Sequence, residues 1–249
     1  MARLKGILKI EGTIQDMTFY KTRDGHLVKS KSGVSKERIA NDPAFVRTRE
    51  NGAEFGSAAK AGKLLRNTLR TFMMSAKDSR VTSRLTQVMT LVKNYDTTSD
   101  RGQRSVAIGI TNASALGLIK NFDFNEKAGL ASVLYKPFTV DRTTGVITIV
   151  GLSPINDVAY PAGATDVIFK GAFASVDFTR GTSDITYTNE INIPLDSTPQ
   201  NIVLTPASLP SGTGTKLVLL TIEFFQTING LQYTLKNGTY NALAIVGAA

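Results

Sequence analysis

KLVLLTIEFFQ, residues 216–226, decides the fold of this chain because it is an unusually apolar run of residues that favour β-strands. An Asn-Gly pair at 229–230, the signature of a tight hairpin turn, separates it from a second apolar segment at 231–246. Together they predict two long strands whose hydrophobic edges have to be covered. A central place in one sandwich would cover them, and so would pairing of the C-terminal strand with a neighbouring subunit.

Upstream of this pair, apolar and polar residues alternate with a period of two as far back as about residue 131. Turn sequences such as YPAG and TRGTSD interrupt this alternation. Within residues 172–179, alternate positions predict a strand with one buried face. Seven or eight strands at this spacing predict an antiparallel Greek-key sandwich of the immunoglobulin or fibronectin type. The expected strands are 131–136, 138–141, 145–150, 165–178, 184–193, 201–205, 216–226 and 231–246.

A long amphipathic helix is predicted over residues 43–76, with Asp42 as its N-cap and Pro43 in its first position. At about 100° per residue, one arc of this helix is apolar and the opposite arc is cationic. The apolar arc holds Phe55, Ala58, Ala61, Gly62, Leu65, Leu69, Phe72, Met73 and Ala76. The cationic arc holds Lys60, Lys63, Arg66, Arg70 and Lys77.

Small residues in this helix lead to two further expectations. Gly52, Gly56 and Gly62 lower helix propensity, which would allow a break near Asn51-Gly52 or Gly56. Ala58 and Gly62 form a notch that lets another element approach closely. A second helix follows from residue 78 or 79, with apolar residues in a heptad pattern at Val81, Leu85, Val88, Val92 and Tyr95. Because the link is short, the two helices are expected to form an antiparallel hairpin.

The segment TFYKTRDGHLVKSK, residues 18–31, predicts a basic β-hairpin. Asp24 and Gly25 suit the centre of a type I′ turn. That turn would place Thr22 opposite Leu27 and Tyr20 opposite Lys29, with the Lys29 ammonium over the Tyr20 ring. Neither face of the hairpin is cleanly apolar, so we expect it to dock on another surface of this chain or of a different one.

These elements predict an α+β protein in three parts. Residues 1–105 form a basic module of β-hairpin and helical hairpin. Residues 106–130 form a connector with a short helix near 113–120, and residues 131–249 form the β-sandwich. The composition, 42% hydrophobic and 20% charged, is that of an ordinary globular protein.

The sequence does not predict a membrane span or a secretory signal. Its apolar runs fall far short of the ~20 residues that a spanning helix needs. Lys9 and Glu11 interrupt the N-terminal segment before an apolar stretch of signal-peptide length can form. The expected place of synthesis is therefore the cytoplasm, with a possible final place inside an assembled particle.

The residue types that carry most enzyme chemistry are scarce, so no catalytic, metal or cofactor site is predicted. The chain has no cysteine and one histidine, His26, which we interpret as a solvated neighbour of the hairpin turn. The sequence SGTGTK at 211–216 lacks the ending of a phosphate loop and precedes a strand, so a turn is expected there. Asp96 and Asp100, and likewise Asp123 and Glu126, are expected to be surface carboxylates.

Charge is distributed unevenly along the chain. Residues 1–105 hold 21 Lys or Arg against 10 Asp or Glu, whereas residues 106–249 hold eight against 10. Such asymmetry predicts an anionic or acidic partner for the first part, although a solvated helix face explains the cationic arc equally well. The candidate contact residues for nucleic acid, another anion or a second subunit are Lys21, Arg23, Lys29, Lys31, Lys60, Lys63, Arg66, Arg70 and Lys77.

The block MTFYKTRDGHLVKSKSGVSKERIANDPAFVRTRENGAEFGSAAKAGKLLR, together with the closing FFQTINGLQYTLKNGTYNALAIV, resembles a group of proteins from flavobacteria and their relatives. Members of that group open with a basic hairpin and an Arg-rich helix, and they close with a β-sandwich. The resemblance covers both ends of the chain and implies a two-part architecture. It implies no activity, cofactor or binding residue.

Three functions are compatible with this sequence. The first is a non-enzymatic, self-assembling structural protein, such as a subunit of a virion-like shell, tube or filament. The second is a nucleic-acid-binding module that uses the hairpin and the cationic arc. The third is a carbohydrate-binding or adhesin-like sandwich, which the lack of tryptophan and of a signal peptide disfavours. We expect the first, with copies of the chain itself as the main partner.

Overall fold

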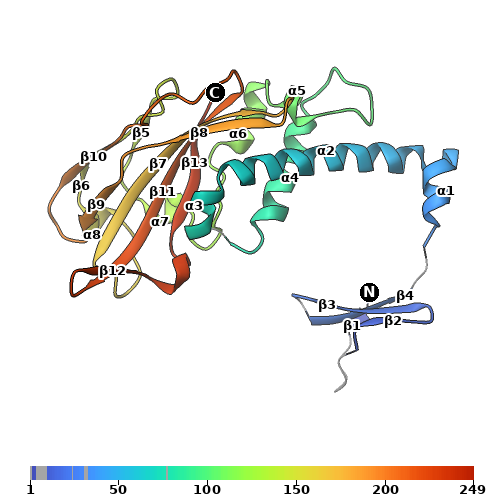
Figure 1. Cartoon of the computed structure of the whole chain (residues 1–249), viewed down its shortest axis with the longest axis horizontal. Helices are drawn as coiled ribbons and strands as arrows, with labels where there is room; N and C mark the ends of the chain where they lie inside the picture. Colours follow the sequence, from blue (N-terminus) through green and yellow to red (C-terminus); the bar gives the residue numbers. More distant parts are fainter. Residues whose placement is uncertain (1, 4–9, 24, 31–32, 77) are drawn as a thin grey trace. The chain divides into compact units, whose positions relative to one another are not determined.

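The computed structural model describes residues 2–3, 10–23, 25–30, 33–76 and 78–249. The chain divides into two compact units, residues 1–49 and 50–249, and each is described by itself. The boundaries expected at residues 105 and 130 both fall inside the second unit. The structure is of the α+β class, with a hairpin, a helical region and a large antiparallel sheet (Figure 1).

The first unit contains a four-stranded antiparallel sheet in the order β1-β4-β3-β2. Its strands are β1 (Ala2–Arg3), β2 (Gly12–Ile14), β3 (Met17–Thr22) and β4 (Gly25–Ser30). The helix α1 (Lys36–Asn41) and the 3-10 turn η1 (Pro43–Phe45) follow. The Asp42 carboxylate accepts the Ala44 amide at 2.9 Å, which confirms Asp42 as a cap with Pro43 after it.

The hairpin prediction is confirmed, but its predicted register is wrong by two residues. Thr22 pairs with Gly25, and Tyr20 pairs with Leu27. The turn therefore comes one position earlier in the chain than expected, and Asp24 of the predicted turn pair lies outside the described residues. Two local features account for this: Gly25 begins β4 with a positive φ of 110°, and the Thr22 hydroxyl donates to the Gly25 carbonyl at 3.0 Å.

Two long strands, β7 (Asp166–Asp177) and β11 (Thr215–Ile228), form the centre of the second unit. On one side β7 pairs with β8 (Thr182–Tyr187) and β9 (Ile191–Pro194). On the other side β11 pairs with β12 (Leu231–Thr234) and β13 (Ala242–Ala248). The outer edge of β13 is also occupied, because the Phe124 amide donates to the Leu243 carbonyl at 2.8 Å. The C-terminal strand is thus an interior strand of its own chain.

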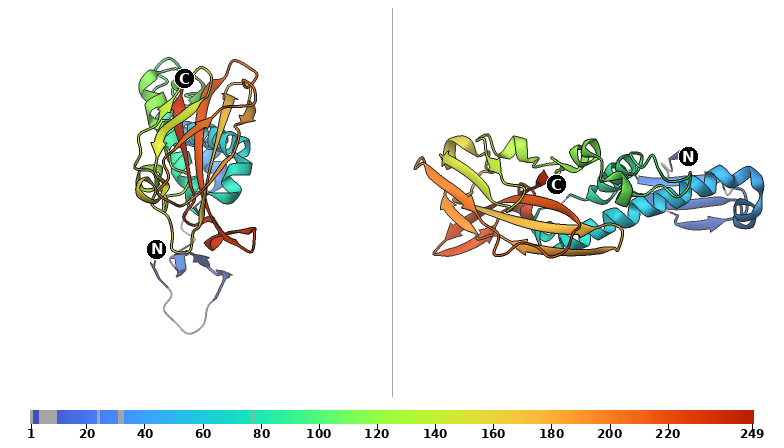
Figure 2. Two further views of the ribbon diagram at one scale, coloured as in Figure 1. Left: turned by 90° about the vertical axis from the view of Figure 1, so that its left-hand side faces the viewer. Right: turned by 90° about the horizontal axis from the view of Figure 1, so that it is seen from above.

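A small sheet packs on one face of the large one (Figures 1 and 2). It contains β5 (Thr139–Val140), β6 (Ile147–Leu152) and β10 (Gln200–Leu204), and the short helix α8 (Pro154–Asp157) follows β6. Ile147, Ile149 and Leu204 of the small sheet are fully buried in one cluster with Phe169 and Leu220 of the large sheet.

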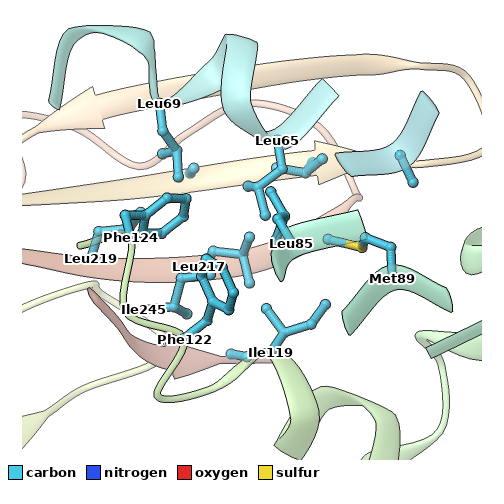
Figure 3. Packing of buried hydrophobic residues seen from close by; sticks show 14 of the residues in the cluster. Leu65, Leu69, Leu85, Met89, Ile119, Phe122, Phe124, Leu217, Leu219 and Ile245 are labelled. Atoms are coloured by element: carbon cyan, nitrogen blue, oxygen red, sulfur yellow. The ribbon is translucent and has the colours of Figure 1, made fainter. Parts of the chain in front are cut away.

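Helices cover the opposite face of the large sheet (Figure 1). They are α2 (Val46–Thr68), α3 (Arg70–Ser75), α4 (Val81–Lys93), α5 (Val106–Gly109) and α6 (Ala113–Ile119). Figure 3 shows Leu65 of α2 and Leu85 of α4 directed toward Leu217 of β11. Both faces of β7 are consequently buried, Phe173 against the small sheet and Ala174 against the helices, which corrects the expectation of one buried face.

The helical region follows the predicted pattern with four corrections. Phe55 is 57% exposed, whereas the rest of the apolar arc is buried. The long helix breaks at Leu69, which has the non-helical angles φ −94° and ψ 15°, and continues through Gly52 and Gly56. α4 crosses α2 steeply (Figure 1), so no antiparallel hairpin forms. The fourth correction concerns the expected heptad: Met89 is fully buried in α4 in place of Val88, and Tyr95 lies after the end of α4 and is 37% exposed.

Residues 131–136 were expected to form a strand, but α7 (Leu130–Val133) lies there. The Asp123 carboxylate accepts the Leu130 amide at 2.8 Å and so holds the first turn of α7. The sequence 236–238 forms the 3-10 turn η2 (Lys236–Gly238) between β12 and β13. The remaining expected strands each overlap an observed strand.

Candidate functional site

The predicted basic residues of the first unit lie on its open sheet. Lys21 of β3, Arg23 of the turn and Lys29 of β4 are exposed. The Lys29 ammonium lies 5.6 Å from the centre of the Tyr20 ring, so the predicted cation–π contact is confirmed. It forms diagonally across the strands, because Lys29 pairs directly with Thr18. Lys31 falls outside the described residues.

One face of this sheet gathers apolar side chains. Cross-strand pairing matches Ile14 with Met17 and Phe19 with Val28, and alternate residues of a strand share a face. Ile14 and Met17 are each 50% exposed, and none of the described residues from 10 to 49 is buried. We call Ile14, Met17, Phe19 and Val28 the open face.

His26 lies on the same side as the open face. It belongs to β4, opposite Lys21, and its side chain is half-buried. Its place in the strand beside the turn is as expected, whereas its side chain is not fully solvated.

The cationic arc of the second unit divides between two grooves. Arg66 and Arg70 line a cavity of about 570 Å³ with Asn67, Ser79 and Thr82. Lys60 lines a separate groove of about 260 Å³, to which the loop after β7 contributes Arg180. Lys60, Lys63 and Arg70 are exposed, whereas Lys77 falls outside the described residues.

Arg66 differs from the rest of the arc because its guanidinium is partly buried. Its Nη1 atom is buried and has no hydrogen-bond partner within the part of the chain that the structure describes. Burial also lowers the pKa of this guanidinium. Nη1 lies where a Cβ on Gly62 would be only 3.5 Å away, next to Leu85 and Met89 of α4. These are ordinary contact distances, so the close approach expected at Gly62 does not depend on the absence of a side chain there.

Two buried carboxylates hold the ends of these helices together. Glu54 of α2 forms an ion pair with Lys93 of α4 and accepts the Gly102 amide at 2.9 Å. Asp96 is fully buried, which corrects its expected surface position. Its carboxylate accepts the amides of Ser99 and Ser105 at 2.9 and 3.0 Å. Burial opposes ionisation of Asp96, but these hydrogen bonds outweigh it and lower its pKa to about 2.

The other predicted surface carboxylates differ in exposure. Asp100 is exposed and the Glu126 side chain is 43% exposed, as expected. Asp123 is half-buried, and burial raises its pKa. The SGTGTK segment forms a turn, in which the Lys216 ammonium donates to the carbonyls of Pro210 and Gly212, each at 3.0 Å.

A charged pocket of about 360 Å³ lies at the edge of the helical layer, and nothing in the sequence pattern predicted it. We call it the Glu223 pocket. The buried Glu223 carboxylate accepts the Ser75 hydroxyl at 2.6 Å and the Lys170 ammonium at 3.3 Å. The same ammonium lies 3.2 Å from the carboxylate of Glu190, whose side chain is 52% exposed. Residues far apart in the sequence meet here, which is why local periodicity carries no signal for the pocket.

The described residues hold neither a cluster of metal-binding side chains nor a membrane-spanning helix. Within them, no three His, Cys, Asp or Glu side chains converge to hold a metal ion. No helix in that same part of the chain has the length and apolar character to cross a membrane.

Comparisons with protein-family models, with curated proteins and with solved structures each returned no match. The resemblance to the flavobacterial group therefore stays a prediction. The function has to be argued from the open face, the basic grooves and the Glu223 pocket.

Proposed function

We propose that this chain is a non-enzymatic structural subunit that assembles with copies of itself, as in a virion-like shell, tube or filament. In this proposal the basic first unit docks on a neighbouring subunit. The observation that carries it is the open face: a four-stranded sheet with no buried residue among those described from 10 to 49. A small sheet normally needs a covered hydrophobic face to be stable, so contact with a partner would supply what the first unit lacks.

A second part of the proposal concerns the path of the chain through the two packed sheets. We propose that its strands follow a Greek-key path of the immunoglobulin type. What supports this is the return of β10 to pair with β6, the strand that precedes the β7–β8 hairpin. β10 returns to the small sheet after β7, β8 and β9 of the large sheet, and the return of a later strand to the side of an earlier one is a feature of Greek keys.

Met17→Asp is expected to weaken self-association at least tenfold in sedimentation velocity, because it places a charge on the open face. Val150→Asp is the matched control, since Val150 is an equally apolar residue that is 65% exposed on β6. Negative-stain microscopy of the unaltered chain is expected to show particles. A chain that stays monomeric at the highest attainable concentration would contradict the proposed function.

Nucleic-acid binding is the second candidate, and the exposed cations of α2 and α3 favour it. Lys60, Lys63 and Arg70 are available to phosphates, and Arg66 has an N–H group that lacks an acceptor among the described residues. Arg66 and Arg70 line the same groove, which the Asp78 carboxylate also lines. Sparse aromatic residues near the groove argue for contacts to phosphates over stacking on bases.

Replacing Lys60, Lys63, Arg66 and Arg70 by Gln is expected to reduce the salt dependence of DNA and RNA binding. The slope of log K against log salt falls by ~0.7–0.9 for each phosphate that the variant no longer neutralises. Titrations at two salt concentrations measure it, with the exposed Lys127→Gln as the control. An unchanged slope in the fourfold variant would remove this groove as a nucleic-acid site.

A further inference from the structure

The Glu223 pocket has an unbalanced charge. Two carboxylates, Glu190 and Glu223, share the single ammonium of Lys170. No other charged side chain of the described residues lines the pocket, so it carries one uncompensated negative charge. A carboxylate has about four acceptor sites, and the hydrogen bonds and ion pairs found here occupy two on Glu223 and one on Glu190. Both carboxylates therefore keep free acceptor sites.

The wall of this pocket is aromatic. The rings of Phe72 and Tyr187 lie with their centres 5.3 Å apart and tilted by 59°. Aromatic faces attract cations, and their apolar surface accommodates an alkyl stem. Carboxylates beside aromatic rings thus suit a cation at the end of an aliphatic chain.

A buried hydroxyl next to the pocket provides an independent indication. Thr221 is fully buried, and its hydroxyl has no hydrogen-bond partner among the residues that the structure describes. It lies in β11 directly opposite Lys170 of β7, so the two side chains share the face that carries Glu223. A buried hydroxyl without a partner is costly. Thr221 does not itself line the pocket, so a group bound there would reach this hydroxyl through a bridging water.

We infer that the Glu223 pocket binds the guanidinium or ammonium group of an arginine or lysine from the first unit of a second copy of this chain. This inference rests on the proposed self-assembly. Charge complementarity supports the source, because residues 1–49 carry 11 Lys or Arg against five Asp or Glu. Arg23 is the leading candidate, since it is exposed in the turn of the hairpin. A free amine offers the same chemistry and is the other source to be tested.

Glu190→Gln and Arg23→Gln are each expected to raise the dissociation constant of self-association by about tenfold to a hundredfold in sedimentation velocity. Glu126→Gln is the control, because this half-exposed carboxylate lies outside the pocket. The double variant Arg23→Gln/Glu190→Gln is expected to be no weaker than either single variant, since both remove one contact. Association that is unaffected by Glu190→Gln would overturn the inference and leave the proposed function standing.

The source is tested with the unaltered chain and two small probes, methylguanidinium and putrescine. Methylguanidinium is expected to shift the Tyr187 ring resonances in NMR and to dissociate the assembly more than sodium chloride does at equal ionic strength. Glu190→Gln is expected to abolish the Tyr187 shift. A monomeric chain whose pocket still binds putrescine would overturn the second-copy source together with the proposed function. A pocket that binds neither probe would overturn the inference itself.

Discussion

Lys93→Met is expected to lower the free energy of unfolding by about 3–5 kcal/mol, because it leaves the buried Glu54 carboxylate without its counter-charge. The side chains of Glu54 and Lys93 are only 6% and 10% exposed. After the substitution, the Gly102 amide would be the one hydrogen-bond donor left to Glu54 within the described part of the chain. This pair joins α2 to α4, two helices that cross steeply. Its removal is therefore expected to loosen the contact between them.

The double variant Glu54→Gln/Lys93→Met is expected to recover much of this stability. It removes both buried charges and keeps an acceptor for the Gly102 amide. Urea denaturation of the single and double variants measures the coupling. Arg180→Met is the control, because its ion pair with Asp177 is exposed and is expected to contribute below about 1 kcal/mol. A Lys93→Met variant as stable as this control would show that the buried pair is not important for stability.

Asp96→Ala is expected to lower the free energy of unfolding by about 2–3 kcal/mol at neutral pH, because amides of the 96–105 loop lose a buried charged acceptor. The destabilisation should depend on pH. The pKa of Asp96 is about 2 in the folded chain, against an ordinary 3.8, so the carboxylate stabilises the fold fully above about pH 4. That contribution disappears as the pH falls from about 4 to about 2.

Denaturation curves at pH 7 and at pH 3 distinguish this mechanism from simple loss of packing. The gap between the unaltered chain and Asp96→Ala should narrow at pH 3, because the unfolded chain, with the ordinary pKa of 3.8, takes up a proton that the native Asp96 carboxylate does not bind. Asp100→Asn is the control, since Asp100 is exposed in the same loop. An Asp96→Ala gap that stays constant between the two pH values would contradict the assigned role of the carboxylate.

Capping residues and the periodicity of apolar residues predicted those helices and strands that depend only on neighbouring residues. Asp42 and Pro43 mark the start of a helical segment because a cap and a fixed φ act within a few residues. The apolar arc from Ala58 to Ala76 is buried because helical periodicity alone places its members on one face. The strands after residue 138 were predicted for the same reason, since their period of two is a property of adjacent residues.

The register of the first-unit hairpin could not be predicted by these rules. The choice between the predicted register, with Thr22 opposite Leu27, and the observed one, with Thr22 opposite Gly25, depends on small differences in local hydrogen bonding, such as the Thr22 hydroxyl bond to Gly25. The Lys29 contact with Tyr20 was predicted from a wrong register, because diagonal neighbours in a sheet also come within reach of long side chains.

The sequence alone determines which segments form helices or strands, which residues cap them, which of their faces are apolar and how unevenly charge is distributed. Each of these features follows from residues close together in the chain. Tertiary structure decided which faces are covered. β7 is buried on both sides since helices and a second sheet enclose it, whereas Phe55 stays exposed on the same helix as Leu65. It also created the Glu54–Lys93 pair and the Glu223 pocket, whose partners are 39 residues apart in the first case and up to 148 in the second. Contacts at such separations depend on how whole elements pack, which no periodicity along the chain records.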